Sequence, residues 1–86
     1  MQFEGAVIKE QGQTFAVVIV KPSVLDYSTE REKTQEGFSR YFPGMPLILM
    51  AQNSRGVPAY HGRPDIVKFL ASIDFRRIPW KRYTLN

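Results

Sequence analysis

The fold is decided by the stretch PLILMAQNSRGVPAYHGRPDIVKFL, residues 46–70. Its apolar run 47–51 is too short for an independent helix and ends at NSRG (53–56), where Asn and Gly suit a tight turn. We therefore predict a hairpin whose second strand covers 57–61. Pro58 has no N–H to donate to a neighbouring strand, so this second strand is expected at a sheet edge.

A helix is predicted directly after the hairpin. Gly62 interrupts the strand, and Pro64 suits the first turn of a helix, where its missing N–H would have no partner. Asp65 complements the positive end of the helix dipole. The apolar residues that follow recur at spacings of three and four, which places them on one buried stripe: Ile66, Phe69, Leu70 and Ile73.

The order of elements from Pro46 to Ile73 resembles the C-terminal half of a thioredoxin-type fold. The resemblance covers this segment alone and includes no family-specific motif. The sequence contains no cysteine, so it lacks the paired cysteines that define the redox activity of that fold. No function is inferred from the resemblance.

The first part of the chain predicts two further strands. Residues 3–10 are predicted to form an edge strand with charges at its end, followed by a turn at 11–12. Residues 14–21 contain the apolar run FAVVIV, which is rich in β-branched side chains. This pattern is typical of a central strand that is covered on both faces.

A further helix is predicted between the two apolar strands. Pro22 ends the second strand, and residues 23–27 are interpreted as a loop or a first turn. Thr29 and Glu32 have the spacing of a capping box, so we predict a helix over 30–42. Its polar half faces solvent, and its anchors to the core are Phe38, Tyr41 and Phe42.

These segments predict one α/β (α+β) domain over residues 1–86, with the element order β-β-α-β-β-α. A right-handed crossover would place the two apolar strands parallel at the centre of a four-stranded mixed sheet, in the order 1-2-3-4. Residues 74–86 are predicted to be an irregular tail, because Pro79 forbids a regular helix and no strand periodicity is visible. Two helices cover a sheet incompletely, so an apolar face is expected to remain for a partner.

Composition argues against several classes of protein. Of the 86 residues, 43% are hydrophobic and 23% charged, which is typical of a folded domain. No apolar run reaches the roughly 20 residues that span a bilayer, and no signal peptide is visible, so we expect a cytoplasmic protein without membrane contact. With no cysteine and one histidine, disulfides, thiolate catalysis and zinc sites are disfavoured, and no metal or cofactor is predicted.

Basic residues concentrate in the C-terminal third. Residues 1–54 hold five Lys or Arg and six Asp or Glu, whereas residues 55–86 hold seven and two. Basic side chains neutralise phosphates and exposed aromatic rings stack on bases, so the tail is a candidate for nucleic-acid binding or for a protein interface. A solvated surface is the alternative. The candidate residues are Arg76, Arg77, Trp80, Lys81, Arg82 and Tyr83.

A second candidate site lies at the start of the helix after the hairpin. A helix N-terminus offers unpaired N–H groups, and an arginine adds a two-pronged donor. A phosphate or carboxylate could therefore bind at His61, Gly62 and Arg63. The alternative is that Gly62 serves chain geometry and that His61 and Arg63 are ordinary surface residues.

Catalysis is a third hypothesis. His61 could act as a general base if folding brought Asp65, Tyr60 or Glu4 near it. The sequence contains no glycine-rich phosphate loop, nucleophile elbow or paired-histidine metal motif. We therefore expect a domain that is not an enzyme and assign no catalytic residue.

Protein association, most simply as a homodimer, is the leading hypothesis. Binding of nucleic acid or another polyanion through the C-terminal third is the alternative. The two differ in their response to salt, because an apolar interface survives added salt whereas phosphate contacts weaken steeply.

Overall fold

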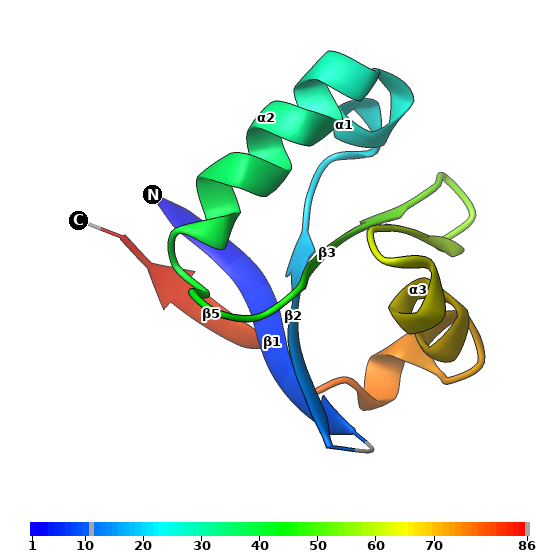
Figure 1. Cartoon of the computed structure of the whole chain (residues 1–86). Helices are drawn as coiled ribbons and strands as arrows, with labels where there is room; N and C mark the ends of the chain where they lie inside the picture. Colours follow the sequence, from blue (N-terminus) through cyan, green and yellow to red (C-terminus); the bar gives the residue numbers. More distant parts are fainter. Residues whose placement is uncertain (11, 86) are drawn as a thin grey trace.

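A computed structural model of the chain describes residues 1–10 and 12–85. One five-stranded sheet runs through the molecule, with helices on both of its faces (Figure 1). The elements in chain order are β1 (Gln2–Glu10), β2 (Gln13–Ile19), α1 (Pro22–Asp26), α2 (Ser28–Ser39), β3 (Leu47–Gln52), β4 (Pro58–His61), α3 (Pro64–Ala71), the 3-10 helix η1 (Phe75–Arg77) and β5 (Lys81–Thr84). The predicted turn at 11–12 lies partly outside the described residues.

The strands follow the order β4-β3-β2-β1-β5 across the sheet. β2 and β3 are parallel at the centre, and the other neighbouring pairs are antiparallel. The predicted parallel centre, with an antiparallel partner outside each central strand, is confirmed. The predicted four-stranded sheet is wrong, because a fifth strand continues the sheet outside β1.

This fifth strand, β5, forms in the tail that the sequence predicts to be irregular. Its residues 81–84 pair antiparallel with residues 2–5 of β1. The ring of Tyr83 stacks on the ring of Phe3, with centroids 5.0 Å apart. Three of its four residues are exposed, so no apolar periodicity marks it in the sequence. Pairing with a distant strand, rather than a local pattern, therefore makes this segment a strand.

The helical connection between β2 and β3 also differs from the prediction. It consists of two helices that meet at Tyr27, whose extended backbone caps α2 without a side-chain hydrogen bond. The predicted capping box is wrong, because Thr29 already lies inside α2. α2 also ends before Tyr41, which is 52% exposed, whereas Phe42 is buried in the core.

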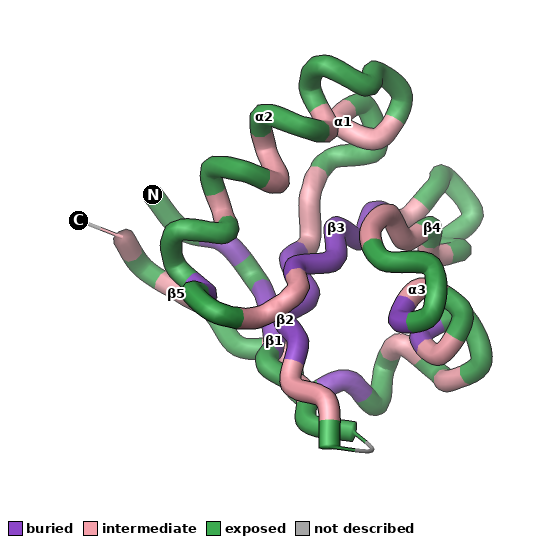
Figure 2. The backbone as a smooth tube through the Cα atoms, viewed as in Figure 1, coloured by how far each residue is buried: buried purple, intermediate pink, exposed green. Residues whose placement is uncertain are grey.

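Each face of the sheet has its own core. α1 and α2 cover one face, called here the α2 face, and α3 and η1 cover the other, called the α3 face. Residues 16–18 and 48–50 of the central strands have no exposed surface, and Figure 2 shows buried residues concentrated on these strands. The expected uncovered apolar face is therefore wrong for the central strands, because helices bury both of their faces within one chain.

The predicted hairpin and the helix after it are present, although β4 begins at Pro58 and Ile73 lies beyond the end of α3. The Asn53 N–H donates to the Val57 carbonyl over 3.0 Å, and Gly56 has a φ of 78° in the turn. The predicted apolar stripe packs on the α3-face core: Ile66 and Leu70 are buried, and Phe69 and Ile73 are partly buried. Within the described part of the chain, no helix is long and apolar enough to cross a membrane.

Candidate association site at the β5 edge

β4 and β5 are the two edge strands of the sheet. In an antiparallel pair, successive residues direct their backbone N–H and C=O groups alternately toward the partner strand and away from it. On an edge strand, the groups directed away have no partner within the sheet. These are the groups that can bind an added strand.

The backbone of β4 offers little to an added strand. The hydrogen bond between Asn53 and Val57 sets the alternation, so Pro58 and Tyr60 direct their backbone groups outward. Pro58 has no N–H, which leaves Tyr60 as the one residue of β4 with both a donor and an acceptor at this edge. The predicted edge position of this strand is confirmed, and proline makes the edge a poor template for pairing.

The backbone of β5, in contrast to that of β4, has donors and acceptors available to an added strand. The Leu85 N–H donates to the Met1 carbonyl over 2.8 Å, and this bond sets the alternation along the β1–β5 pair. Arg82 and Thr84 therefore direct both their N–H and their C=O away from β1. Neither residue is a proline, so each can exchange two hydrogen bonds with an added strand.

Exposed apolar side chains lie beside β5 on the α2 face. Phe3, on which Tyr83 stacks, also lies 6.5 Å from the ring of Tyr41, measured between centroids. Tyr41 lines one shallow hollow with Met1, which is 71% exposed. Val7, 43% exposed, lines another with Tyr83. The open strand edge and this apolar surface are therefore continuous.

No match was found when the chain was compared with protein families, curated proteins and solved structures. These comparisons therefore add no support to the resemblance of residues 46–73 to part of a thioredoxin-type fold, and β5 lies outside that segment.

The aromatic residues of the basic tail pack against the rest of the chain. Trp80 lies against the α3-face core, and its indole N–H donates to the Phe75 carbonyl over 3.0 Å. Tyr83 lies on Phe3 on the opposite face. Stacking on a nucleic-acid base would have to use the part of each ring that these contacts leave exposed.

The basic residues of the tail lie in different settings. Arg76 donates to both oxygens of Asp74, over 3.0 and 2.9 Å, and this contact lowers the pKa of the Asp74 carboxyl. Lys81 and Arg82 are adjacent in β5, so their side chains project from opposite faces of the sheet. Arg82 lies 3.5 Å from Glu4 on β1. Arg77 lines a hollow under η1.

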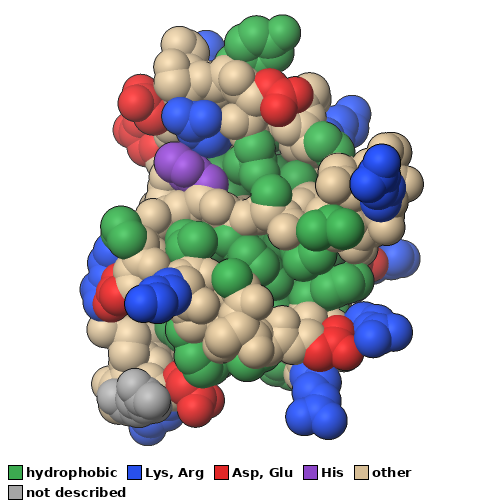
Figure 3. Space-filling view, turned by 90° about the vertical axis from the view of Figure 1, so that its right-hand side faces the viewer, with side chains coloured by type: hydrophobic (Ala, Val, Ile, Leu, Met, Phe, Trp, Pro, Cys, Tyr) green, Lys and Arg blue, Asp and Glu red, His purple; other side chains and the backbone are tan. Residues whose placement is uncertain are grey.

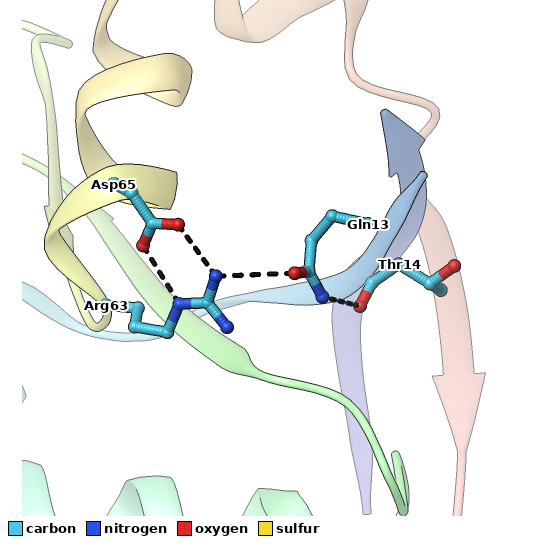
Figure 4. A network of polar contacts seen from close by, with 4 residues as sticks. All are labelled: Gln13, Thr14, Arg63 and Asp65. Carbon is cyan, nitrogen blue, oxygen red and sulfur yellow. Dashed lines mark hydrogen bonds and ion pairs between the residues drawn. The ribbon is translucent and has the colours of Figure 1, made fainter. Parts of the chain in front are cut away.

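Figure 4 shows Arg63 of the candidate anion site with its polar partners. The Arg63 guanidinium donates to both oxygens of Asp65, over 2.9 and 2.7 Å, and to the Gln13 side-chain oxygen over 3.3 Å. The hydrogen bonds from Arg63 lower the pKa of Asp65 to about 2. An incoming anion would thus compete with a carboxylate that already occupies the two-pronged donor.

His61 and its candidate catalytic partners lie on different sides of the sheet. His61 pairs with Leu49, which belongs to the α2-face core, whereas Tyr60 pairs with Met50 of the α3-face core. Asp65 is held by Arg63, and Glu4 lies beside Arg82. Among the described residues, no group of three or more His, Cys, Asp or Glu side chains is placed to hold a metal ion.

A second apolar surface lies on the side of the molecule that carries α3 and the hairpin. Figure 3 shows hydrophobic side chains gathered across the middle of this side, with charged side chains around them. Partly buried apolar residues packed on the α3-face core include Tyr60, Val67, Phe69 and Ile73. The backbone under this surface belongs to a helix and to an edge strand that contains proline. A partner could therefore make apolar contacts here, but it would find few unpaired backbone N–H and C=O groups.

The sequence did not single out Thr84, whose backbone groups point outward at the β5 edge, or the exposed residues beside it. Tyr83 and Thr84 are residue types favoured in strands, and they follow Pro79, so a short edge strand was the one local signal available. The hydrogen-bond direction of Arg82 and Thr84 depends on the register with β1, which no local pattern reveals.

Proposed function

We propose that this chain is a non-enzymatic domain that associates with protein by adding a strand to the β5 edge. The observation that carries the proposal is the outward direction of the backbone N–H and C=O groups of Arg82 and Thr84. Main-chain hydrogen bonds along such an edge supply affinity, and neighbouring side chains supply selectivity.

The surroundings of the edge support this function. Solvent-exposed Met1, Val7 and Tyr41 lie next to β5, and an added strand would cover part of their apolar surface. Each square ångström of apolar surface removed from water contributes roughly 25 cal/mol. Strand addition therefore combines directional backbone bonding with apolar burial at one place.

Binding of a polyanion is the second candidate function. It is favoured by the seven Lys or Arg residues within 55–86, against two Asp or Glu. The separate placement of Lys81 and Arg82 on two faces and the pairing of Arg76 with Asp74 give it less support. An anion bound at His61, Gly62 and Arg63 is a narrower form of the same idea and requires Arg63 to release Asp65.

The proposal is tested with a synthetic peptide of residues 79–85, which supplies an extended strand. Amide hydrogen exchange is measured by NMR on the intact domain while this peptide, or more of the chain itself, is added. We expect the Arg82 and Thr84 amides to become protected, because their outward N–H groups gain acceptors. The Tyr60 amide at the opposite edge should keep its exchange rate, and a peptide with proline at positions 82 and 84 should protect neither amide.

Two results would contradict the proposal. One is unchanged exchange of Arg82 and Thr84 at every concentration of chain and peptide. The other is binding of a short mixed-sequence oligonucleotide that is lost at moderate salt while the β5 amides stay unprotected, which would favour the polyanion function.

A further inference from the structure

We infer that the strand added to β5 is the β5 strand of a second copy of this chain, antiparallel to the first and related by a two-fold axis at Tyr83. This inference rests on the proposed function and names its partner. In this register, Arg82 lies opposite the partner's Thr84, Thr84 opposite the partner's Arg82, and Tyr83 opposite the partner's Tyr83.

The direction of the backbone groups selects this register. Arg82 and Thr84 are the β5 residues whose N–H and C=O point outward. Only an axis at Tyr83, midway between them, places Arg82 of each chain opposite Thr84 of the other. Four backbone hydrogen bonds result, because Arg82 and Thr84 form two hydrogen-bonded pairs across the axis and each pair exchanges one N–H and one C=O per strand.

The register with its axis at Arg82 is disfavoured for two reasons. It places Arg82 directly opposite the partner's Arg82, and like charges in that position repel. It also pairs Thr84 with the partner's Trp80. The backbone N–H of Trp80 already donates to the Ile78 carbonyl over 2.8 Å, so it has no free donor for the added strand. The axis at Tyr83 avoids both problems, because each arginine then faces a threonine.

The same axis brings the apolar surfaces of the two chains together. A two-fold axis perpendicular to the sheet keeps the α2 faces of both copies on one side. The Tyr83 rings then lie opposite each other as a non-hydrogen-bonded pair, with Cα atoms about 4.5 Å apart. Each ring is already stacked on Phe3 of its own chain, so an aromatic cluster continues across the axis.

The opposite edges explain why association would stop at two copies. Joining the β5 edges makes one continuous sheet, and a β4 strand lies at each outer end. Pro58 deprives that edge of a hydrogen-bond donor, so further copies have no open row of groups to pair with. The pairing therefore closes as a dimer, as two-fold symmetric interfaces do.

Disulfide cross-linking tests the register, because the chain has no cysteine of its own. Four single variants, Lys81→Cys, Arg82→Cys, Tyr83→Cys and Thr84→Cys, are oxidised at a concentration at which the wild-type chain is dimeric by light scattering. Residues opposite each other on the axis lie within disulfide reach, whereas the same residue offset along the strands does not. We expect Tyr83→Cys to form covalent dimers at least about tenfold faster than the other three variants.

A second pair of variants tests the dimer while keeping Tyr83. Thr84→Pro removes an outward N–H, whereas Thr84→Val keeps it and replaces only the side chain. We expect Thr84→Pro to reduce the measured mass from twice the chain mass to the chain mass, and Thr84→Val to remain a dimer. Circular dichroism of both variants checks that the domain is folded.

The outcomes separate this inference from the proposed function. Fastest cross-linking at Arg82→Cys or Thr84→Cys, or a wild-type chain that stays monomeric at every concentration, would overturn the inference. If the peptide nevertheless protects the Arg82 and Thr84 amides, strand addition at β5 stands, in another register or with a different partner strand. If the amides stay unprotected as well, the proposed function fails too.

Discussion

Gly62 is a residue whose missing side chain the structure requires. It lies between β4 and α3, where a Cβ would overlap the Ile48 Cδ1 methyl and lie 3.2 Å from the Leu47 carbonyl oxygen. Close approach of the chain to β3, rather than interruption of a strand alone, therefore explains this glycine.

Substitution of Gly62 tests this explanation. We expect Gly62→Ala to lower the free energy of unfolding by about 1–3 kcal/mol, because β3 must move to admit the methyl group. Gly37→Ala is the matched control: no atom lies within 4 Å of the added Cβ, and alanine is favoured inside a helix. The control should raise the free energy of unfolding by about 0.5–1 kcal/mol in urea titrations. Equal losses in both variants would refute the close-approach argument.

The Arg63–Asp65 pair predicts a pH dependence. The pKa of Asp65 is about 2 in the folded chain against an ordinary value of 3.8, so its stabilising contribution is present above pH 3.8 and is lost as the pH falls through about 2. We expect Arg63→Ala to raise the Asp65 pKa toward 3.8, measured by carboxyl NMR titration. The Asp74 pKa, lowered by Arg76, should not change and serves as the internal control. An Asp65 pKa still near 2 in the variant would show that Arg63 is not its cause.

The buried Tyr60 hydroxyl makes the stability of the folded state depend on pH in the opposite direction. Among the described residues, it has no hydrogen-bond partner. Burial raises its pKa above the ordinary 10.0, so the folded state retains a proton that the unfolded chain releases, and stability falls as the pH rises above about 10. Tyr60→Phe should be at least as stable at pH 7 and should lose less stability between pH 9 and about 11. A variant clearly less stable at pH 7 would indicate a hydrogen bond to this hydroxyl.

At the scale of elements, the segments with strong local signals were predictable. Local sequence patterns predict these segments. They are the apolar runs of β2 and β3, the Asn53–Gly56 turn and the apolar stripe of α3. α2 was placed with shifted ends because it contains no buried residue and no side-chain cap that would fix its start.

β5 could not be predicted, because its stability depends on a partner strand at the far end of the chain. Its neighbour, β1, presents Phe3 on the α2 face, and only the folded sheet brings Tyr83 onto that ring. The candidate association site shares this limit. The sequence indicated Lys81, Arg82 and Tyr83 as interface candidates, but for their charge and aromatic rings rather than for their backbone.

At the scale of the whole molecule, the two sheet edges have opposite properties. Both edge strands have four residues, but one carries Pro58 and the other carries the outward N–H and C=O groups of Arg82 and Thr84. Under the proposed pairing of two chains, this asymmetry would stop assembly at a dimer, and a single substitution at Pro58 would remove that limit.

Pro58→Val should open the second edge. Valine supplies the missing N–H, which points away from β3 because Pro58 occupies an outward position opposite Gln52. We expect the mass measured by light scattering to rise with concentration beyond that of two chains. Val57→Ser removes an exposed apolar side chain at the same edge without adding a backbone N–H, and should leave the mass unchanged. Mass that stays at two chains for Pro58→Val would show that this proline does not limit assembly.

The pairing of the two chain ends has a consequence for the order of folding. Met1 and Leu85 bond to each other although 84 positions separate them, so docking β5 closes almost the whole chain into a loop. Loop-closure entropy makes such a long-range contact slow to form. While β5 is detached, the outer side of β1 is itself an unpaired edge, and β5 from another molecule could fill it with the same contacts. Domain swapping is thus available to this fold as a slow competitor of native pairing, and it should be most frequent when concentrated chains refold together.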